Sequence, residues 1–181
     1  MYIKAIVMMT LITTLLTGTY NVIAMDKSLR AGDTSPDFEL KDQKGAVHTL
    51  ADYRDRWLVL YFYPKNDTQG CTKEACNFRD DHVRLKKLGA DVLGVSIDNQ
   101  QSHEEFANKY GLPFPLLADT DGKVSALYGS FFSLGPLRYS RRHTFIIDPN
   151  GRIAQVYRSV SPATHSDDVI RDLGELQKTS R

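Results

Sequence analysis

Two cysteines, Cys71 and Cys76, are the residues of this sequence best suited to chemistry, and it contains no others. A cysteine attacks its target as the thiolate, and an unperturbed thiol, with a pKa of about 8.5, is only a few per cent ionised at neutral pH. Cys71 falls in or just before the first turn of a predicted helix. Unpaired backbone N–H groups and the helix dipole favour an anion there, so Cys71 is predicted to be an activated nucleophile.

The spacing of the two cysteines limits the bond that they can form with each other. In a regular helix, positions i and i+5 have Cα atoms about 8.6 Å apart and point about 140° away from each other. A disulfide requires Cα atoms roughly 4.4–6.8 Å apart. We therefore predict that the segment from Thr68 to about Phe78 unwinds on oxidation, helped by the low helix propensity of Gly70. A static structural disulfide, the ordinary alternative in an exported protein, is disfavoured by the same geometry.

The elements that must position these thiols alternate between strand and helix. Strands are predicted over 38–40, 47–50, 57–63, 92–97, 114–118, 144–147 and 153–157, and helices over about 75–88, 102–110 and 122–128 and from 166 onward. The apolar run 57–63 is typical of a strand buried on both faces and therefore central. Parallel crossovers followed by an antiparallel pair and a last helix predict an α/β, thioredoxin-like fold, with a central mixed sheet flanked by helices and an N-terminal β-hairpin.

The N-terminal residues stand apart from this pattern. Residues 1–24 carry one charge, Lys4, then an apolar stretch, and small residues precede a cleavage point after Ala24. This arrangement predicts a signal peptide, with residues 5–24 as an uncleaved membrane anchor in the alternative, and a single domain over 25–181. The protein is accordingly expected to be exported and periplasmic.

Charge excludes some partners of the domain. The chain has 23 Lys and Arg against 22 Asp and Glu, and without Lys4 the two signs balance. A neutral domain has no electrostatic reason to bind nucleic acid or anionic lipid. We therefore expect no nucleic-acid partner and no membrane contact by the mature domain.

The residues around Cys71 resemble a known family. The run Pro64-x-x-x-Thr68-x-x-Cys71 is similar to the active-site motif of peroxiredoxins, and the segment 70–76 is similar to their Q type, also called bacterioferritin comigratory protein. The resemblance extends over the mature chain, from Gly32 to the segment 142–151. Between Tyr128 and Arg142, however, the sequence departs from the linkers typical of this type.

The resemblance implies roles for five residues. Cys71 would be the peroxidatic cysteine, Cys76 the resolving cysteine, and Thr68 would hold the peroxide oxygens. Pro64 would shield the sulfur from water, and Arg142 would stabilise the thiolate and polarise the leaving oxygen. The implied enzyme is a thioredoxin-dependent, atypical 2-Cys peroxidase that reduces hydroperoxides as a monomer, with a thioredoxin-like dithiol protein as its reductant and with no metal or organic cofactor.

Other functions and roles remain open at this point. A thiol–disulfide oxidoreductase would have two residues between its cysteines rather than four. An exported copper chaperone of the same fold would have three and would need a histidine ligand, for which His143 is the candidate. Arg141 competes with Arg142 for the cationic role. Thr68 is also a candidate helix N-cap, and Glu74 a favourable acid in the first helical turn.

Overall fold

The computed structural model describes residues 28–179, so the predicted signal peptide or anchor over 1–24 lies outside the described residues. The strands are β1 (Glu39–Lys41), β2 (Val47–Thr49), β3 (Trp57–Phe62), β4 (Ala90–Ser96), β5 (Leu116–Ala118), β6 (Phe131–Leu134), β7 (Leu137–Ser140), β8 (His143–Ile147) and β9 (Ile153–Tyr157). The helices are η1 (Leu50–Tyr53), α1 (Gln69–Asp80), α2 (His82–Lys87), α3 (Gln100–Tyr110), α4 (Lys123–Leu127) and α5 (His165–Thr179). Within this described part, no helix is long and apolar enough to cross a membrane.

The central sheet has the order β5-β4-β3-β8-β9, with β3, β4 and β5 parallel and β8 and β9 antiparallel. Strand β3 lies in the middle, and all six of its residues are buried. The prediction of a central strand from the apolar run 57–63 is therefore confirmed. The N-terminal hairpin β1–β2 is also present, as a separate two-stranded sheet.

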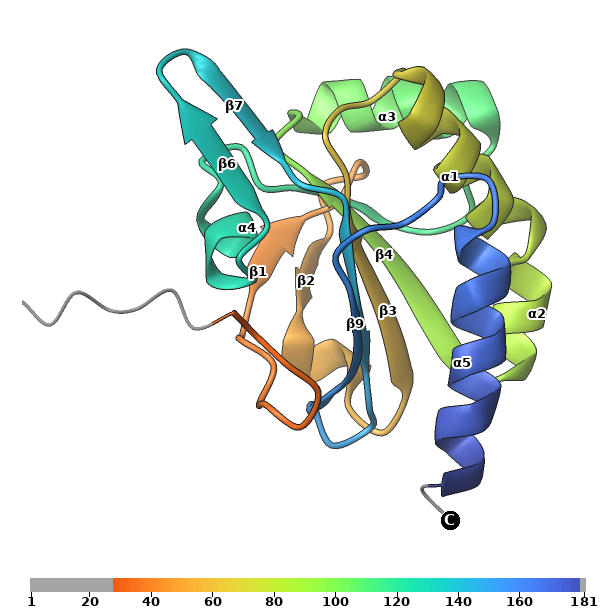
Figure 1. The fold of residues 1–181 in the computed structure, drawn as a ribbon. Helices are drawn as coiled ribbons and strands as arrows, with labels where there is room; N and C mark the ends of the chain where they lie inside the picture. The colour runs from red at the N-terminus through yellow and green to blue at the C-terminus, as the bar shows by residue number, and fades with distance from the viewer. Residues whose placement is uncertain (1–27, 180–181) are drawn as a thin grey trace, which may run out of the picture.

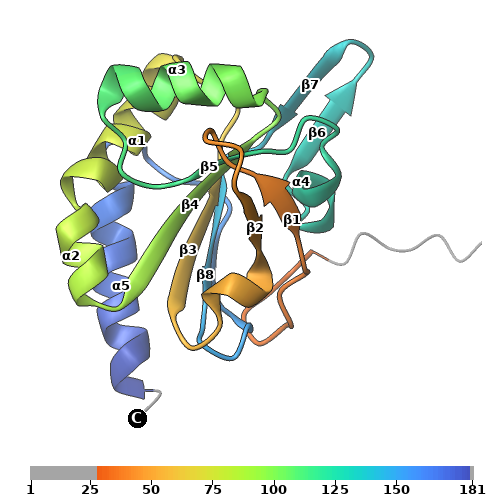
Figure 2. The same ribbon diagram turned by 180° about the vertical axis from the view of Figure 1, so that it is seen from behind.

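Side-chain alternation along β3 divides the core into two layers. Its odd-numbered residues pack with Phe78 and Leu173, on the face that α1, α2, α3 and α5 cover (Figure 1). Its even-numbered residues pack with Val124 and Phe145, on the face covered by α4 and the β1–β2 hairpin, which Figure 2 shows from behind. Cys71 belongs to the first layer, so the cysteine-bearing helix is held directly against the sheet.

Three local features differ from the sequence-based expectation. The helix predicted to run to Leu88 is interrupted at Asp81, which ends α1 and precedes α2. The N-cap of α3 is Asn99, whose side chain accepts a hydrogen bond from the Ser102 N–H, so the helix predicted to begin at Ser102 begins earlier. Asparagine is as good a cap as serine, and the helix starts one turn earlier.

The third difference is a second hairpin, which the sequence did not predict. Strands β6 and β7 form a separate two-stranded sheet over 131–140, in the segment that departs from the family pattern. In Figures 1 and 2 this hairpin extends beyond the rest of the molecule, at the end of the sheet where α1 begins. Its sequence lacks the Asn-Gly or Asp-Gly turn that signals a hairpin most strongly, since the turn is Gly135-Pro136.

Candidate active site

The loop between β3 and α1 is tied to the body of the protein by Asn66, which is buried. Its backbone N–H donates to Asp98 Oδ2 (2.9 Å), and its side-chain amide donates to Ser102 Oγ (2.8 Å) and to His103 Nδ1 (3.1 Å). Burial lowers the pKa of His103 to about 4, so its neutral ring can accept this hydrogen bond. These contacts fix the loop that leads into α1. The sequence reasoning missed this network, because its members lie on three separate elements.

Two further contacts complete the loop. The hydroxyl of Tyr63, at the end of β3, donates to Asn66 Oδ1 at 2.8 Å. Asp67 has a left-handed backbone (φ 58°), which aspartate tolerates better than most residues, and its carboxylate pairs with Lys109 at 2.8 Å. The backbone therefore turns sharply at Asp67 and enters α1 in a defined direction.

Cys71 lies in the first turn of α1, as predicted, and is 1% exposed. Arg142, which immediately precedes β8, points its Nη2 to the Cys71 Sγ at 3.1 Å. The first helical hydrogen bond runs from the Thr72 N–H to the Thr68 carbonyl, so the N–H of Cys71 has no acceptor within the helix. A thiolate at this position would be stabilised by a guanidinium, by this N–H and by the helix dipole.

Glu74 is the second partner of Arg142. It is 1% exposed, and its Oε2 accepts a hydrogen bond from Arg142 Nη1. Burial raises the pKa of the Glu74 carboxyl to about 7, against the lowering effect of Arg142. The expectation that Glu74 is only a first-turn acid is therefore wrong, since it lies beyond the first turn and binds Nη1 of the guanidinium whose Nη2 contacts the sulfur. Its spacing of three residues from Cys71 puts both groups on one helix face, a signal that was present in the sequence.

Gly70 provides the space for this arrangement. A Cβ atom built on Gly70 would lie 3.3 Å from Arg142 Nη2 and 3.7 Å from Pro162 Cγ. A side chain here would crowd the guanidinium that contacts Cys71. Besides the low helix propensity noted in the sequence, glycine thus allows the close approach of Arg142 to the helix.

Cys76 is half-buried and lies in the same uninterrupted helix as Cys71. Both thiols are free. Because α1 runs regularly from Gln69 to Asp80, the Cα atoms of Cys71 and Cys76 are too far apart to form a disulfide in this conformation.

Thr68 and Pro64 lie on the loop before the helix. Thr68 is the N-cap residue of α1, but its side chain makes no capping hydrogen bond and its hydroxyl donates instead to the Lys65 carbonyl at 3.1 Å. It is exposed, and Pro64 is half-buried at the end of β3. The roles of these two residues toward a peroxide stay predictions.

The structure separates the competing candidates. The guanidinium of Arg141 lies over the Phe132 ring, 5.6 Å from its centroid, on the β6–β7 hairpin. His143, the candidate copper ligand, is buried with its Nδ1 3.1 Å from Ser130 Oγ, whereas its neighbour Arg142 contacts the cysteine. The basic residue at the site is thus Arg142, and the position of His143 gives no support to a copper site shared with the cysteines.

Comparison with known proteins adds independent evidence. The sequence matches the AhpC/TSA family over residues 31–156. It is 41% identical over 150 residues to the chloroplastic peroxiredoxin Q of Sedum lineare, covering 81% of this chain and 78% of that protein. It is 36% identical over 159 residues to peroxiredoxin Bcp of Bacillus subtilis (strain 168), covering 83% of this chain and 99% of that protein.

A solved structure agrees with these matches. The bacterioferritin comigratory protein of Xanthomonas campestris, studied for its alkyl peroxide reduction activity, aligns with a TM-score of 0.72 and 34% sequence identity, over 76% of this chain and 90% of that chain. The predicted thioredoxin-like fold, with its central mixed sheet and N-terminal hairpin, is confirmed.

The comparisons also correct the predicted location. The relatives include the chloroplastic protein of Sedum lineare and the Bcp of Bacillus subtilis, and neither is named as a periplasmic protein. The expectation of an exported, periplasmic protein is therefore wrong. It rested on the apolar composition of residues 5–24, and such a composition does not by itself specify a compartment.

The fold, the cysteine site and the relatives agree on one assignment. The match over 31–156 covers more than half of the chain, and the relatives at this level of identity are peroxiredoxins of a single type. The chain belongs to the AhpC/TSA family and is a peroxiredoxin of the Q (Bcp) type, a peroxidase.

Proposed function

We propose that this peroxiredoxin reduces hydrogen peroxide and organic hydroperoxides through Cys71 and is regenerated through a disulfide with Cys76. The observation that carries the proposal is the contact between the buried Cys71 Sγ and Arg142 Nη2, at 3.1 Å, in the first turn of α1. A thiolate stabilised in this way is a nucleophile for the O–O bond.

In the first step the Cys71 thiolate attacks the terminal oxygen of the hydroperoxide. An S–O bond forms as the O–O bond breaks, and the departing alkoxide or hydroxide takes up a proton to become an alcohol or water. Cys71 is oxidised to sulfenic acid. Arg142 lies beside the reacting sulfur, where negative charge develops, and Glu74 holds its other terminal nitrogen in place. Thr68 is proposed to orient the peroxide, and Pro64 is proposed to shield the sulfur from water.

In the second step the thiol of Cys76 attacks the sulfenic sulfur of Cys71. The S–S bond forms and water leaves, with the oxygen coming from the sulfenic acid. Because both residues lie in α1, the start of this helix must unwind before the two sulfur atoms can meet. A thioredoxin-like dithiol protein then reduces the disulfide by exchange and becomes oxidised itself.

All the groups in this reaction come from one chain, so we propose that the monomer is competent. The reducing partner is proposed from the family and from the intramolecular disulfide, which a vicinal dithiol can open in two exchange steps. The measurement is specific activity as a function of protein concentration. Constant specific activity supports a competent monomer, whereas a rise with concentration contradicts it.

The experiment that tests the proposal follows peroxide consumption by the purified protein with thioredoxin, thioredoxin reductase and NADPH. The Cys71→Ser variant is expected to consume no peroxide. The Cys76→Ser variant is expected to consume one equivalent, to give a sulfenic acid that a specific reagent traps, and then to stop. Turnover that persists in Cys71→Ser, or copper binding without any peroxide turnover by the parent protein, would contradict the proposal.

A further inference from the structure

The β6–β7 hairpin has one apolar face whose tip the rest of the molecule does not cover. In the antiparallel register Phe132 pairs with Tyr139, and Leu134 pairs with Leu137, so these four side chains lie on the same face. The two rings stack at 4.8 Å between centroids. Leu134 is 69% exposed and Leu137 is 54% exposed, and both lie at the tip.

The opposite face of the hairpin attaches it to the body. The Phe131 ring packs on Gly122, where a Cβ atom would come within 2.4 Å of the ring. The buried Ser140 hydroxyl contacts Ser125 Oγ at 2.8 Å, and Arg138 Nη2 donates to the Asp121 carbonyl at 2.8 Å. The base is thus fixed on α4 and its neighbouring loop, while the apolar face and the tip point away.

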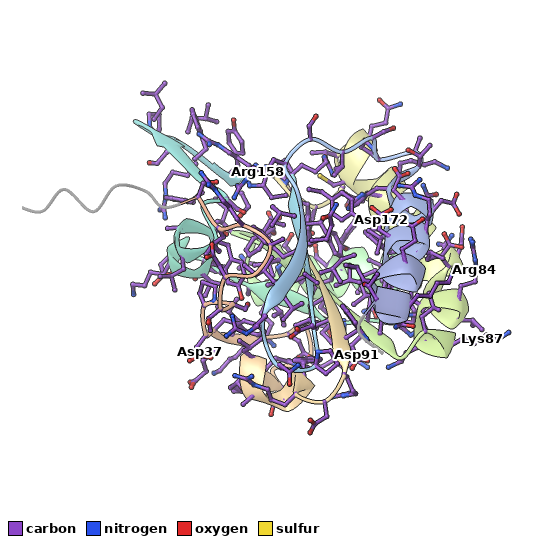
Figure 3. All side chains as sticks on the ribbon, turned by 60° about the horizontal axis from the view of Figure 1, so that its bottom comes forward. Asp37, Arg84, Lys87, Asp91, Arg158 and Asp172 are labelled. Carbon is purple, nitrogen blue, oxygen red and sulfur yellow. The ribbon has the colours of Figure 1, made fainter. Side chains whose placement is uncertain are left out.

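Basic residues outnumber acidic ones on this part of the chain, where Asp121 at the hairpin base pairs with Lys123. Between Asp121 and Asp148 the chain has basic residues but no acidic residue. Arg138 and Arg141 lie on the hairpin, over the rings of Phe131 and Phe132. Arg158 lies within 3.5 Å of His143, near the base of the hairpin (Figure 3). The near-zero net charge of the domain was the basis for predicting no membrane contact. It does not exclude a local basic region at this hairpin.

We propose that the β6–β7 hairpin docks this protein on an anionic lipid surface, with its leucine tip inserted and its arginines at the headgroups. Four residues per strand at about 3.4 Å each give the hairpin a reach of about 14 Å. Apolar faces of surface-bound elements insert about 5–10 Å. Leucines at the tip, aromatic rings behind them and arginines at the base follow the order of polarity across a membrane interface.

A protein partner fits this surface less well. A stable interface needs roughly 800 Å² and about 20–30 residues from each partner. The apolar face offers four side chains on an isolated two-stranded projection. The proposal goes beyond the peroxidase reaction. Because Arg142 follows the hairpin so closely, docking would also bring the Cys71 site near the lipid, a consequence that rests on the proposed function.

The test is co-sedimentation with vesicles of phosphatidylcholine alone and of phosphatidylcholine with an equal part of phosphatidylglycerol. Every helix and strand that the structure describes lies within residues 28–179, so the chain from residue 28 is compared with the full chain. This comparison separates the hairpin from the apolar segment 5–24. The chain from residue 28 is expected to bind the anionic vesicles, more weakly as salt rises.

Two pairs of variants localise the binding. Leu134→Ser with Leu137→Ser is expected to weaken it at least about tenfold. The matched control, Val47→Ser with Val83→Ser, removes exposed apolar side chains elsewhere and is expected to leave it unchanged. Arg138→Gln is expected to weaken it about fivefold at low salt. Lys87→Gln, on α2 and away from the hairpin in Figure 3, is expected to have no such effect.

Three outcomes would overturn the proposal. They are no binding to anionic vesicles by the chain from residue 28 at low salt, an equal loss in the Val47 and Val83 control, and a dimer in solution that the Leu134 and Leu137 substitutions dissociate. The last would show that a second copy covers this face. Turnover of hydrogen peroxide without vesicles is expected to be unchanged in the leucine variant, so failure of docking is distinguishable from failure of the peroxidase function.

Discussion

Arg142 contacts two groups that carry negative charge when ionised, the Cys71 sulfur and the Glu74 carboxyl, through different nitrogens. A guanidinium presents its donors in a fixed plane, so one side chain can hold both partners in a defined geometry. Glu74 lies in the helix of Cys71, whereas Arg142 comes from a segment 68 residues further along the chain. The contact therefore joins the sheet to the reactive helix.

Arg142→Lys is expected to slow the reaction of the reduced protein with hydrogen peroxide about a hundredfold, the order of magnitude found when one donor to a developing charge is removed. An ammonium group keeps the charge but cannot reach both partners in the same fork geometry. The measurement is the single-turnover rate of peroxide consumption. Arg141→Lys is the matched control, because its guanidinium lies on the hairpin. Equal effects of the two substitutions would show that the site does not depend on the fork of Arg142.

Glu74 gives a prediction about stability and pH. Burial raises the pKa of its carboxyl from 4.5 to about 7, so between these values the folded protein holds a proton that the unfolded chain releases. The free energy of unfolding therefore falls, through this group, as pH rises from about 4.5 to about 7. Glu74→Gln is expected to remove this contribution, so the variant gains stability relative to the parent over that range.

The measurement for Glu74 is the urea midpoint of parent and variant at pH 5 and at pH 7.5. Comparing the two proteins at each pH cancels the titration of all other groups. A constant difference between them would mean that the carboxyl does not titrate in this range. A difference that changes in the opposite direction would mean that the pKa is lowered rather than raised.

Helix α1 carries both thiols in a regular conformation that keeps them apart, so its start would have to unwind for the proposed disulfide to form. The loop before it is anchored by Asn66 and packed against α3 through Ser102 and His103. Motion is therefore expected to begin after this anchor, within the first turns of the helix. The break at Asp81 limits the segment that can unwind, because α2 is a separate helix packed on β4.

Amide exchange of residues 69–78 is expected to be faster in the disulfide form than in the reduced form. The bond between Cys71 and Cys76 requires Cα atoms closer than a regular helix allows, so the helical hydrogen bonds of this segment must open. Residues of β3 serve as the internal control, since they are buried in both layers of the core. Equal protection of residues 69–78 from amide exchange in the two forms would contradict the prediction that this segment unwinds.

At the scale of the whole molecule, three histidines are enclosed in the fold. They are His103 against the active-site loop, His143 at the start of β8 and His165 at the start of α5. Burial lowers the pKa of each to about 4, with Arg158 and Arg141 also acting on His143. The folded protein therefore holds them neutral at a pH where the unfolded chain protonates them.

We expect the protein to lose stability steeply as pH falls from about 6.5 towards 4. The contribution of each buried histidine is fully present above the unfolded pKa of about 6.5, and its loss approaches about 1.4 kcal/mol per pH unit below it. The measurement is the urea midpoint at pH 7, 6 and 5. His165→Gln, which removes one of the three groups, is expected to show a smaller decrease. An unchanged midpoint between pH 7 and pH 5 would contradict the prediction.

The sequence by itself determined the central strand of the sheet and the position of Cys71 at the start of a helix. Seven apolar residues in a row at 57–63 are typical of a strand buried on both faces, and the spacing of the cysteines prevents their bond within a regular helix. The motif ending at Cys71 was sufficient to indicate the family. These features are local, so they can be predicted from the periodicity and spacing of residues that are close together in the sequence.

The tertiary structure decided which distant groups meet. Only the pairing of β3 with β8 brings Arg142 rather than Arg141 to Cys71, and only burial turns Glu74, expected as a first-turn acid, into the anchor of a guanidinium. The apolar face of the β6–β7 hairpin likewise exists only once the strands pair in register. Contacts between distant segments depend on how the elements pack. The pattern of polar and apolar residues within one element does not specify which residues of another element it will contact.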